Sequence, residues 1–266
     1  MKLLQLLITI KIFKRIIPSL VKRFLKIINK SILIIKFKKI VLEININEPM
    51  DQLIFFHNNY EDKQINYLIN KIKKFNPSIF LDIGCNSGLY SLIIAKNFPK
   101  LKILSFEPVQ ETFLKFKKNI KLNKKIKNIK PYNFGLSSKN RDLILQAKIR
   151  DGYIQQGGAG IIRKDTKVPL NHLNKSLATL LATFKKGDDT IKFKNKIITC
   201  KIDVEGHELD VLKGIINILK KNKLILQIEI FDSEYKKVNS FLKKNNYHQI
   251  NKIFSDGKND YYFKNF

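Results

Sequence analysis

The sequence predicts an α/β protein whose central, mostly parallel sheet carries helices on both faces. Three stretches support this prediction, because each holds a short apolar run, then a polar loop, then a run with helical spacing. They are Ile79–Phe98, Lys102–Asn123 and Ile197–Leu219. Parallel strands need a long crossover connection, usually a helix, so this repeated order favours a parallel sheet. Open sheets of this kind bind ligands at the carboxyl ends of their strands, where these polar loops lie.

Residues 1–42 form the first predicted unit, a basic amphipathic helical arm. Residues 1–40 contain eleven Lys or Arg and no acid, with Leu, Ile and Phe between them. We expect one or two helices, broken near Pro18. The uncharged start, Leu3–Ile10, is too short to span a bilayer, and no small-residue cleavage site follows it. Such an arm suits peripheral contact with an anionic membrane. The alternative is an arm that covers the catalytic domain or a partner subunit.

The second predicted unit, residues 43–266, begins with a lead-in to the sheet. A short strand is expected over Val41–Ile46, followed by a loop through Pro49. A helix is expected over Asp62–Phe75, because acids in the first turn favour a helix start. Asn76-Pro77-Ser78 then ends this helix before the first strand of the sheet.

The stretch Ile79–Gly88 is the centre of the predicted ligand site. Three apolar residues of a buried strand lead into Asp82, and glycines follow at positions 84 and 88. The spacing D-x-G-x-x-x-G differs from the G-x-G-x-x-G of dinucleotide sites. Glycines allow a tight turn and a close approach of backbone N–H groups at a helix start to a ligand. The predicted loop residues are Asp82, Gly84, Cys85, Asn86 and Gly88. A tight turn without a ligand is the alternative.

The second strand, Lys102–Phe106, ends in Glu107-Pro108. A carboxylate at this point can accept hydrogen bonds from the two hydroxyls of a ribose. Alternatively, Glu107 is an ordinary acid at a helix N-terminus. A third strand is predicted over Ile129–Asn133, and Phe134 after it is placed where an adenine ring could stack.

Residues 137–196 carry few signals. Asp142–Ile149 reads as a strand, Gln155–Gly160 as a flexible loop and Lys185–Asp189 as a turn. A connection of this length between two strands commonly forms a lid or an acceptor pocket. The alternative is an insertion without a role at the site.

Four ionisable residues follow the strand Ile197–Lys201, between its end and a helix with an amphipathic period. They are Asp203, Glu205, His207 and Glu208. Such a cluster suits a general base or a divalent cation, and a helix cap with solvated acids is the alternative. We assign no residue to a resident metal. The next buried strand, Lys223–Phe231, delivers Glu229 to the same edge. A helix over Asp232–Asn245 and the strands Tyr247–Phe254 and Asp260–Lys264 close the chain, with Gly257 in a hairpin-like turn between these strands.

The composition argues against a nucleic-acid partner despite a formal net charge of +29. Of the 51 Lys and Arg residues only five are Arg, the residue preferred for bidentate phosphate and base contacts. The two cysteines, Cys85 and Cys200, lie in predicted buried positions without metal-ligand spacing. Nothing in their number requires an oxidising compartment, so we expect a cytoplasmic protein.

Taken together, three motifs resemble the FkbM family of S-adenosylmethionine (SAM)-dependent methyltransferases. They are the D-x-G-x-x-x-G loop, Phe106-Glu107-Pro108, and Asp203-Val204-Glu205-Gly206-His207-Glu208 followed by Leu212-Lys213-Gly214. The similarity covers roughly residues 50–232, with Asn59-Tyr60-Glu61 resembling the family's lead-in. It departs at Lys164–Asn195, where the usual threonine-leucine-aspartate element is not clear.

This resemblance implies a Rossmann-like, seven-stranded methyltransferase sheet whose last strand is antiparallel. It implies that Asp82, Gly84 and Gly88 surround the methionine part of SAM, that Glu107 holds the ribose, and that Asp203 and Glu205 lie near the transferred methyl group. The family is mostly associated with O-methylation of hydroxyls on sugars or secondary metabolites, so the implied acceptor is a small molecule, a glycan or a lipid-linked glycan.

Two other classes of function stay open at this point. A nucleotide-sugar-dependent glycosyltransferase could use Asp203-Val204-Glu205 as a metal site, but the Asp82 loop would then have no role. A non-catalytic, membrane-associated scaffold could keep the fold and use the basic arm. The sequence does not predict an oligomeric state.

Overall fold

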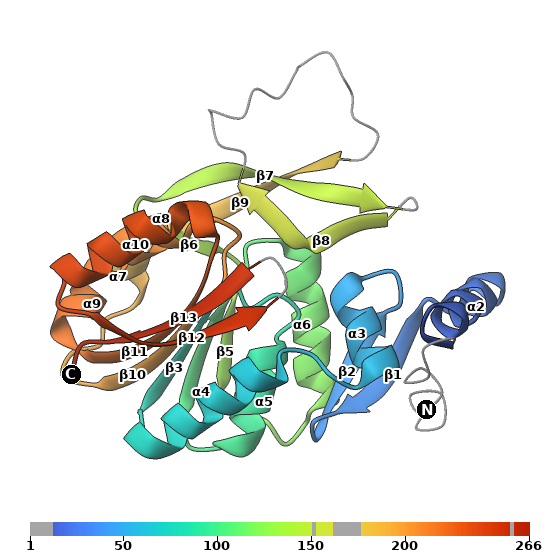
Figure 1. Ribbon diagram of the computed structural model, residues 1–266, viewed down its shortest axis with the longest axis horizontal. Helices are drawn as coiled ribbons and strands as arrows, with labels where there is room; N and C mark the ends of the chain where they lie inside the picture. The colour runs from blue at the N-terminus through green and yellow to red at the C-terminus, as the bar shows by residue number, and fades with distance from the viewer. Residues whose placement is uncertain (1–12, 151–152, 162–176, 256–257) are drawn as a thin grey trace, which may run out of the picture.

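The computed structural model describes residues 13–150, 153–161, 177–255 and 258–266. Its centre is a seven-stranded sheet in the order β12-β13-β11-β10-β3-β4-β5 (Figure 1). All strands run parallel except β13, which is antiparallel to both neighbours. The predicted fold class is therefore confirmed. The strand bounds are β3 Ile79–Ile83, β4 Lys102–Phe106, β5 Ile129–Tyr132, β10 Ile197–Ile202, β11 Lys223–Ile230, β12 His248–Ser255 and β13 Lys258–Lys264.

Helices cover the sheet on both faces and bury a separate apolar core on each. One core lies beneath α4, α5 and α6, and the other beneath α8, α9 and α10. In β3 the side chain of Phe80 joins the first core, whereas Leu81 and Ile83 join the second, as the alternation of a strand requires. The helix bounds are α4 Asp62–Phe75, α5 Leu89–Asn97, α6 Gln110–Leu122, α8 Glu208–Gly214, α9 Ile216–Lys221 and α10 Asp232–Lys244.

A second, four-stranded sheet in the order β6-β9-β7-β8 lies across the carboxyl-end edge of the central sheet, with β6 beside α8 and β8 beside α6 (Figure 1). The strands are β6 Gly135–Ser137, β7 Arg141–Arg150, β8 Tyr153–Ile161 and β9 Leu177–Lys186, with α7 at Gly187–Thr190. The strand predicted over Asp142–Ile149 is confirmed as part of β7. The loop predicted over Gln155–Gly160 is wrong, because this segment pairs with β7 and continues a strand despite its three glycines. The turn predicted at Lys185–Asp189 is instead the end of β9 and the start of α7.

The N-terminal arm is shorter than predicted and is followed by a β-hairpin. Helix α2 spans Phe13–Ile27 and continues through Pro18, so the predicted break at that residue is wrong. Residues 32–42 are not helical, because the apolar side chains alternate along β1 Ile32–Phe37 and β2 Ile40–Asn45 and one face of the hairpin is buried. Helix α3 follows at Pro49–His57.

Two asparagines, one in α6 and one at its C-terminal end, join this hairpin to the rest of the chain. The backbone N–H of Val41 donates to Asn123 Oδ1 at 2.9 Å, and the N–H of Glu43 donates to Asn119 Oδ1 at 2.7 Å. Asn123 Nδ2 also donates to the carbonyl oxygen of Val41 at 2.7 Å. The exposed edge of β2 therefore pairs with side chains instead of with another strand.

The helix predicted after Asp203 is divided into α8 and α9 at Ile215. Gly214 explains the close packing there, since a Cβ on this residue would lie 1.9 Å from the carbonyl oxygen of Ser137 in β6. Gly257 and part of the segment 164–195 lie outside the described residues. Within the described ranges, none of the helices has both the length and the apolar character needed to cross a membrane.

Candidate active site

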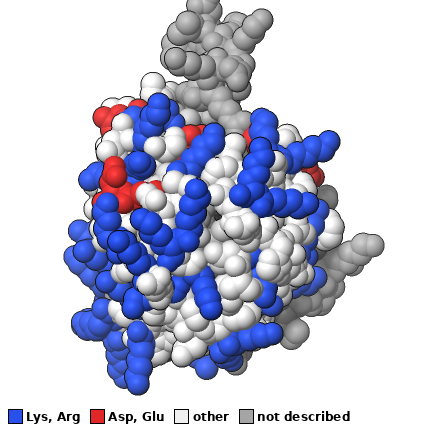
Figure 2. Space-filling view, turned by 90° about the vertical axis from the view of Figure 1, so that its left-hand side faces the viewer, with Lys and Arg blue, Asp and Glu red and all other residues white. Residues whose placement is uncertain are grey.

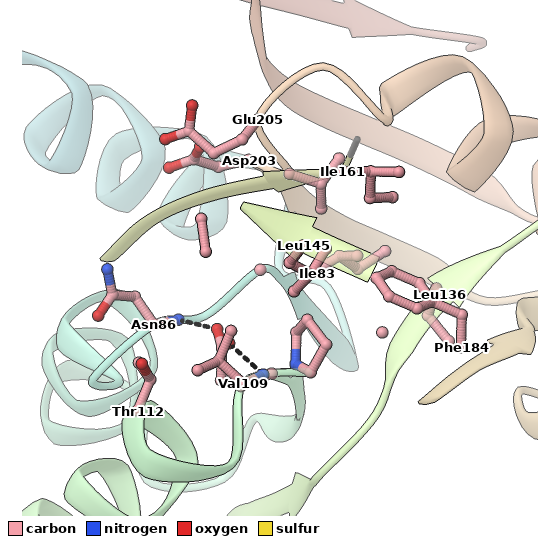
Figure 3. Close-up of a pocket in the computed structure, with 16 residues that line it drawn as sticks. Ile83, Asn86, Val109, Thr112, Leu136, Leu145, Ile161, Phe184, Asp203 and Glu205 are labelled. Atoms are coloured by element: carbon pink, nitrogen blue, oxygen red, sulfur yellow. Dashed lines mark hydrogen bonds between the residues drawn. The ribbon is translucent and has the colours of Figure 1, made fainter. Parts of the chain in front are cut away.

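The loop between β3 and α5 is fixed by the end of the neighbouring strand β4. The N–H groups of Gly84 and Cys85 both donate to the carbonyl oxygen of Phe106 at 3.0 Å. The next residue of β4, Glu107, accepts from the N–H of Asn86 at 2.9 Å and from the N–H of Val109 at 2.9 Å (Figure 3). Two loops at the carboxyl edge of the sheet are thus held together by one carboxylate.

Glu107 has the chemistry of a hydrogen-bond acceptor for a ligand. Its side chain is buried, and burial raises its pKa to about 7, although the two backbone N–H donors act in the opposite direction. A carboxylate offers about four lone-pair positions, and the two backbone donors use one on each oxygen. Two positions remain for donors such as the neighbouring hydroxyls of a ribose.

The two loop glycines are required by packing as well as by backbone conformation. Gly84 has a φ of +79°, and a Cβ there would lie 1.9 Å from the carbonyl oxygen of Asp203. Gly88 has a φ of +84°, and a Cβ there would overlap the ring of Phe116. Gly84 lines the pocket described below, whereas Gly88 does not.

Asp82 lies beneath the loop. It is fully buried, and its Oδ2 accepts from the hydroxyl of Ser91 at 2.5 Å. Its Oδ1 has no hydrogen-bond partner among the described residues, and burial raises the pKa of the carboxyl while the ammonium of Lys201 lowers it. Asp82 does not line the pocket, so its position is that of a support for the loop and for β10.

A pocket of about 630 Å³, including its open mouth, lies above these loops. Its floor comes from the β3 and β4 loops and from the first turn of α6, where Val109 and Thr112 lie. Its other wall comes from the small sheet, through Leu145, Ala159, Ile161 and Phe184.

Asp203 and Glu205 line one end of the pocket, and their carboxylates lie beside each other in Figure 3. One oxygen of each lies within 4.8 Å of an oxygen of Glu229 from β11, as the sequence predicts for this edge. All three side chains are half-buried. Oxygen ligands of this kind also suit a divalent cation.

Lys201 is a buried cation next to these acids. Its Nζ lies 2.8 Å from Asp203 Oδ2 and 4.6 Å from the centre of the Tyr90 ring. Burial alone would lower the pKa of Lys201, but Asp203, Glu61 and Asp82 together raise it. Lys201 is therefore a fixed positive charge that holds Asp203 in place.

Of the four ionisable residues predicted as candidate catalytic groups, Asp203 and Glu205 line the pocket, whereas His207 and Glu208 do not. Glu205 and Gly206 both have positive φ, so the chain turns away from the pocket after Glu205. His207 lies behind the pocket wall, with its Nε2 2.9 Å from Ser137 Oγ and its ring against Phe184. Glu208 is buried at the start of α8 and accepts from the N–H of Gly206 at 2.8 Å.

The remaining predicted residues divide between the pocket and the core. Asn86 and Pro108 line the pocket, whereas Cys85 is buried in the core beneath α5. Phe134 packs against Phe106 and Tyr132 instead of lining the pocket. Its two successors in the chain, Gly135 and Leu136, line the pocket in its place.

Sequence reasoning missed several pocket residues. The four residues from β7, β8 and β9 carried no signal, because their strands alternate only weakly and the site depends on how the small sheet folds over. Lys201 did carry a signal, since a single lysine inside the apolar run Ile197–Ile202 requires a buried counter-ion.

Comparison with known proteins gives a consistent result. A family model described as the methyltransferase FkbM domain matches residues 82–249, well over half of the chain. Methyltransferase sdnD from Sordaria araneosa is 28% identical over 164 residues, which cover 53% of this chain and 61% of that protein. The hexuronic acid methyltransferase AglP from Haloferax volcanii is 26% identical over 153 residues, with 56% and 55% covered. The chain thus spans less than two thirds of the length of these relatives.

Solved structures of similar fold include an FkbM methyltransferase from Methylobacillus flagellatus, with 14% identity and a TM-score of 0.47 over 71% of this chain and 44% of that one. A second is TYW2 from M. jannaschii in complex with AdoMet, with 10% identity and a TM-score of 0.45 over 89% and 87%.

Proposed function

The chain belongs to the FkbM family of methyltransferases, whose methyl donor is SAM, and we propose that it methylates a hydroxyl oxygen of a sugar or glycan. The observation that carries this proposal is the arrangement of one pocket: Glu107 lies on its floor, and Asp203 and Glu205 line one end.

The residues that line the pocket suit SAM in their chemistry. Glu107 has two lone-pair positions left for the ribose hydroxyls, and the apolar side chains of Val109, Leu136 and Leu145 suit the adenine ring. When bound, SAM supplies an electrophilic methyl group on a positively charged sulfur. Negative charge at Asp203 and Glu205 favours such a cation near them.

Of the two pocket carboxylates, Glu205 suits the role of proton acceptor better. Asp203 forms an ion pair with buried Lys201, and a proton on Asp203 would remove the carboxylate charge that lies nearest to that ammonium. A proton taken up by Glu205 instead relieves repulsion among the three neighbouring acids. We therefore assign Glu205 to accept the hydroxyl proton as its oxygen attacks, and Asp203 to orient the hydroxyl.

A hydroxyl-rich acceptor follows from the same acids, because carboxylates accept hydrogen bonds from several hydroxyls at once. The relative AglP is named for a hexuronic acid, which also favours a sugar. Hexuronic acids and neutral hexose glycans are therefore the first acceptors to test.

Glu205→Gln tests this assignment. We expect SAM binding, measured by calorimetry, to change by less than about threefold, and methyl transfer to a sugar acceptor to fall about 100-fold or more. The matched control is Glu111→Gln, an exposed acid of α6 outside the pocket, which should change neither. Product NMR should show a methyl group on oxygen.

Three results would contradict the proposal. The first is an unchanged transfer rate in Glu205→Gln. The second is methylation of an amine or thiol acceptor while every hydroxyl acceptor stays unmodified. The third is absence of SAM binding by the folded wild-type protein, with binding of a sugar nucleotide instead.

A further inference from the structure

Helix α2 has two apolar faces, and only one of them packs on the protein. The packed face carries Ile17, Val21 and Leu25, which meet Ile46 and Phe56 of the neighbouring segments. This contact fixes the helix at one end of the molecule, beside β1 and α3 (Figure 1). The orientation of its second face is thereby set.

The second face is an exposed apolar stripe, which we define as Ile16, Leu20, Phe24 and Ile27. Their spacing of four, four and three residues places them on one side of a helix. Leu20 is 58% exposed, Phe24 60% and Ile27 78%. Other exposed large apolar side chains, such as Leu181 and Phe254, stand on separate strands far along the chain, and isolated exposure of that kind is ordinary.

Cations lie along one side of the stripe, and α2 contains no acidic residue. Arg23 and Lys26 are exposed and follow the stripe around the helix, and exposed Lys30 comes just after its end. The first acidic residue of the chain is Glu43. Charge alone would not distinguish this end, because Lys and Arg also cover the opposite end of the molecule (Figure 2). The combination of cations with a continuous apolar stripe does distinguish it.

We propose that α2 binds the surface of an anionic lipid bilayer, with the apolar stripe among the acyl chains and Arg23 and Lys26 at the lipid phosphates. An amphipathic helix with a basic flank binds membranes in this way, parallel to the surface. The inference goes beyond methyl transfer, and it concerns residues outside the pocket.

The charge pattern selects a membrane over a second copy of the chain. Two α2 stripes packed on each other would bring Arg23, Lys26 and their symmetry mates together with no acid from this segment to compensate. An anionic headgroup layer supplies the opposite charge along with an apolar interior.

The experiment is sedimentation of the full chain with vesicles of phosphatidylcholine containing about 30% phosphatidylglycerol, and with pure phosphatidylcholine. We expect binding to the anionic vesicles and at least tenfold weaker binding to the neutral ones. Leu20→Ser/Phe24→Ser should weaken anionic binding at least tenfold. The matched control Leu181→Ser/Phe254→Ser removes a leucine and a phenylalanine that are even more exposed, at 75% each, and should bind like the wild type.

A charge-reversal pair completes the design. Arg23→Glu/Lys26→Glu should lose binding, whereas Lys236→Glu/Lys243→Glu on α10 should keep most of it. If both charge-reversal variants lost vesicle binding to the same extent, the binding would be an unspecific attraction of a lysine-rich protein, and the proposal would be overturned. A dimer in light scattering that Leu20→Ser/Phe24→Ser makes monomeric, with no vesicle binding by the wild type, would overturn it as well.

Discussion

Glu107 couples the pocket to pH, because burial raises its pKa to about 7. The ionised carboxylate can accept hydrogen bonds from ribose hydroxyls, whereas the protonated form loses part of this capacity. Ligand binding to the ionised form releases a proton below pH 7. Affinity for SAM should therefore be highest above pH 7 and decline as the pH falls through that value.

The expected dissociation constant of SAM rises about tenfold per pH unit below pH 7. Calorimetry between pH 5.5 and 8.5 measures this slope. Glu107→Gln should bind weakly at every pH, with the slope abolished. Glu208→Gln is the matched control, because burial raises the pKa of Glu208 to about 7 as well, yet Glu208 lies outside the pocket. A slope lost in the Glu208 variant and kept in the Glu107 variant would refute this account.

Lys201 holds the side chain of Asp203 in position through an ion pair. The lysine is buried in β10, and its ammonium reaches the strand end where Asp203 begins the loop. Lys201 stands on a strand, and a side chain on a strand is held more rigidly than one on a loop. The carboxylate of Asp203 is therefore positioned before a ligand binds.

At the level of elements, the loops after β3 and β10 meet where the backbone of Gly84 approaches the backbone of Asp203. Gly84 approaches the carbonyl of Asp203 so closely that any side chain would separate the two loops. This contact connects two loops that both line the pocket.

Gly84→Ala should destabilise the fold by at least about 2 kcal/mol, through the positive φ and the overlap with Asp203. Gly158→Ala is the matched control, because a Cβ at Gly158 meets no atom within 4 Å. It should change the free energy of unfolding by less than about 1 kcal/mol. Urea unfolding measures the free energy of unfolding of both variants. If Gly84→Ala lost as little stability as Gly158→Ala, the close contact between the loops would not contribute to the stability of the fold.

Sequence reasoning succeeded where a local pattern carried the information. The strand–loop–helix units around Asp82 and Glu107 each have their own period and turn residues, and both were placed correctly. It failed at Gln155–Gly160, where glycines suggested a loop but pairing with β7 imposed a strand. His207 and Glu208 were predicted together with Asp203 and Glu205 but lie outside the pocket, because the backbone reverses direction at Glu205 and Gly206.

At the level of the whole molecule, the net charge of +29 makes the compact state electrostatically unfavourable. Salt should weaken this repulsion between like charges, since the Debye length shrinks from about 30 Å at 0.01 M to about 3 Å at 1 M. We expect the Tm to rise by several degrees between 0.01 and 0.5 M NaCl, at about 2–4 °C for each kcal/mol gained.

Scanning calorimetry or fluorescence measures this rise. Lys236→Glu/Lys243→Glu lowers the formal charge by four, from +29 to +25, and should reduce the salt effect. A Tm that falls with salt would mean that ion pairs, such as that of Lys38 and Asp62, contribute more than repulsion does.

The position of β13 has a consequence for synthesis on the ribosome. This strand is translated after β12, yet it lies between β12 and β11 and supplies the pairing for both. A nascent chain that has emerged only as far as β12 therefore exposes the backbone edge of β11 in a sheet that is otherwise formed. During that interval the growing polypeptide is most open to chaperones and to mispairing with other chains, and the arrival of residues 258–264 ends it.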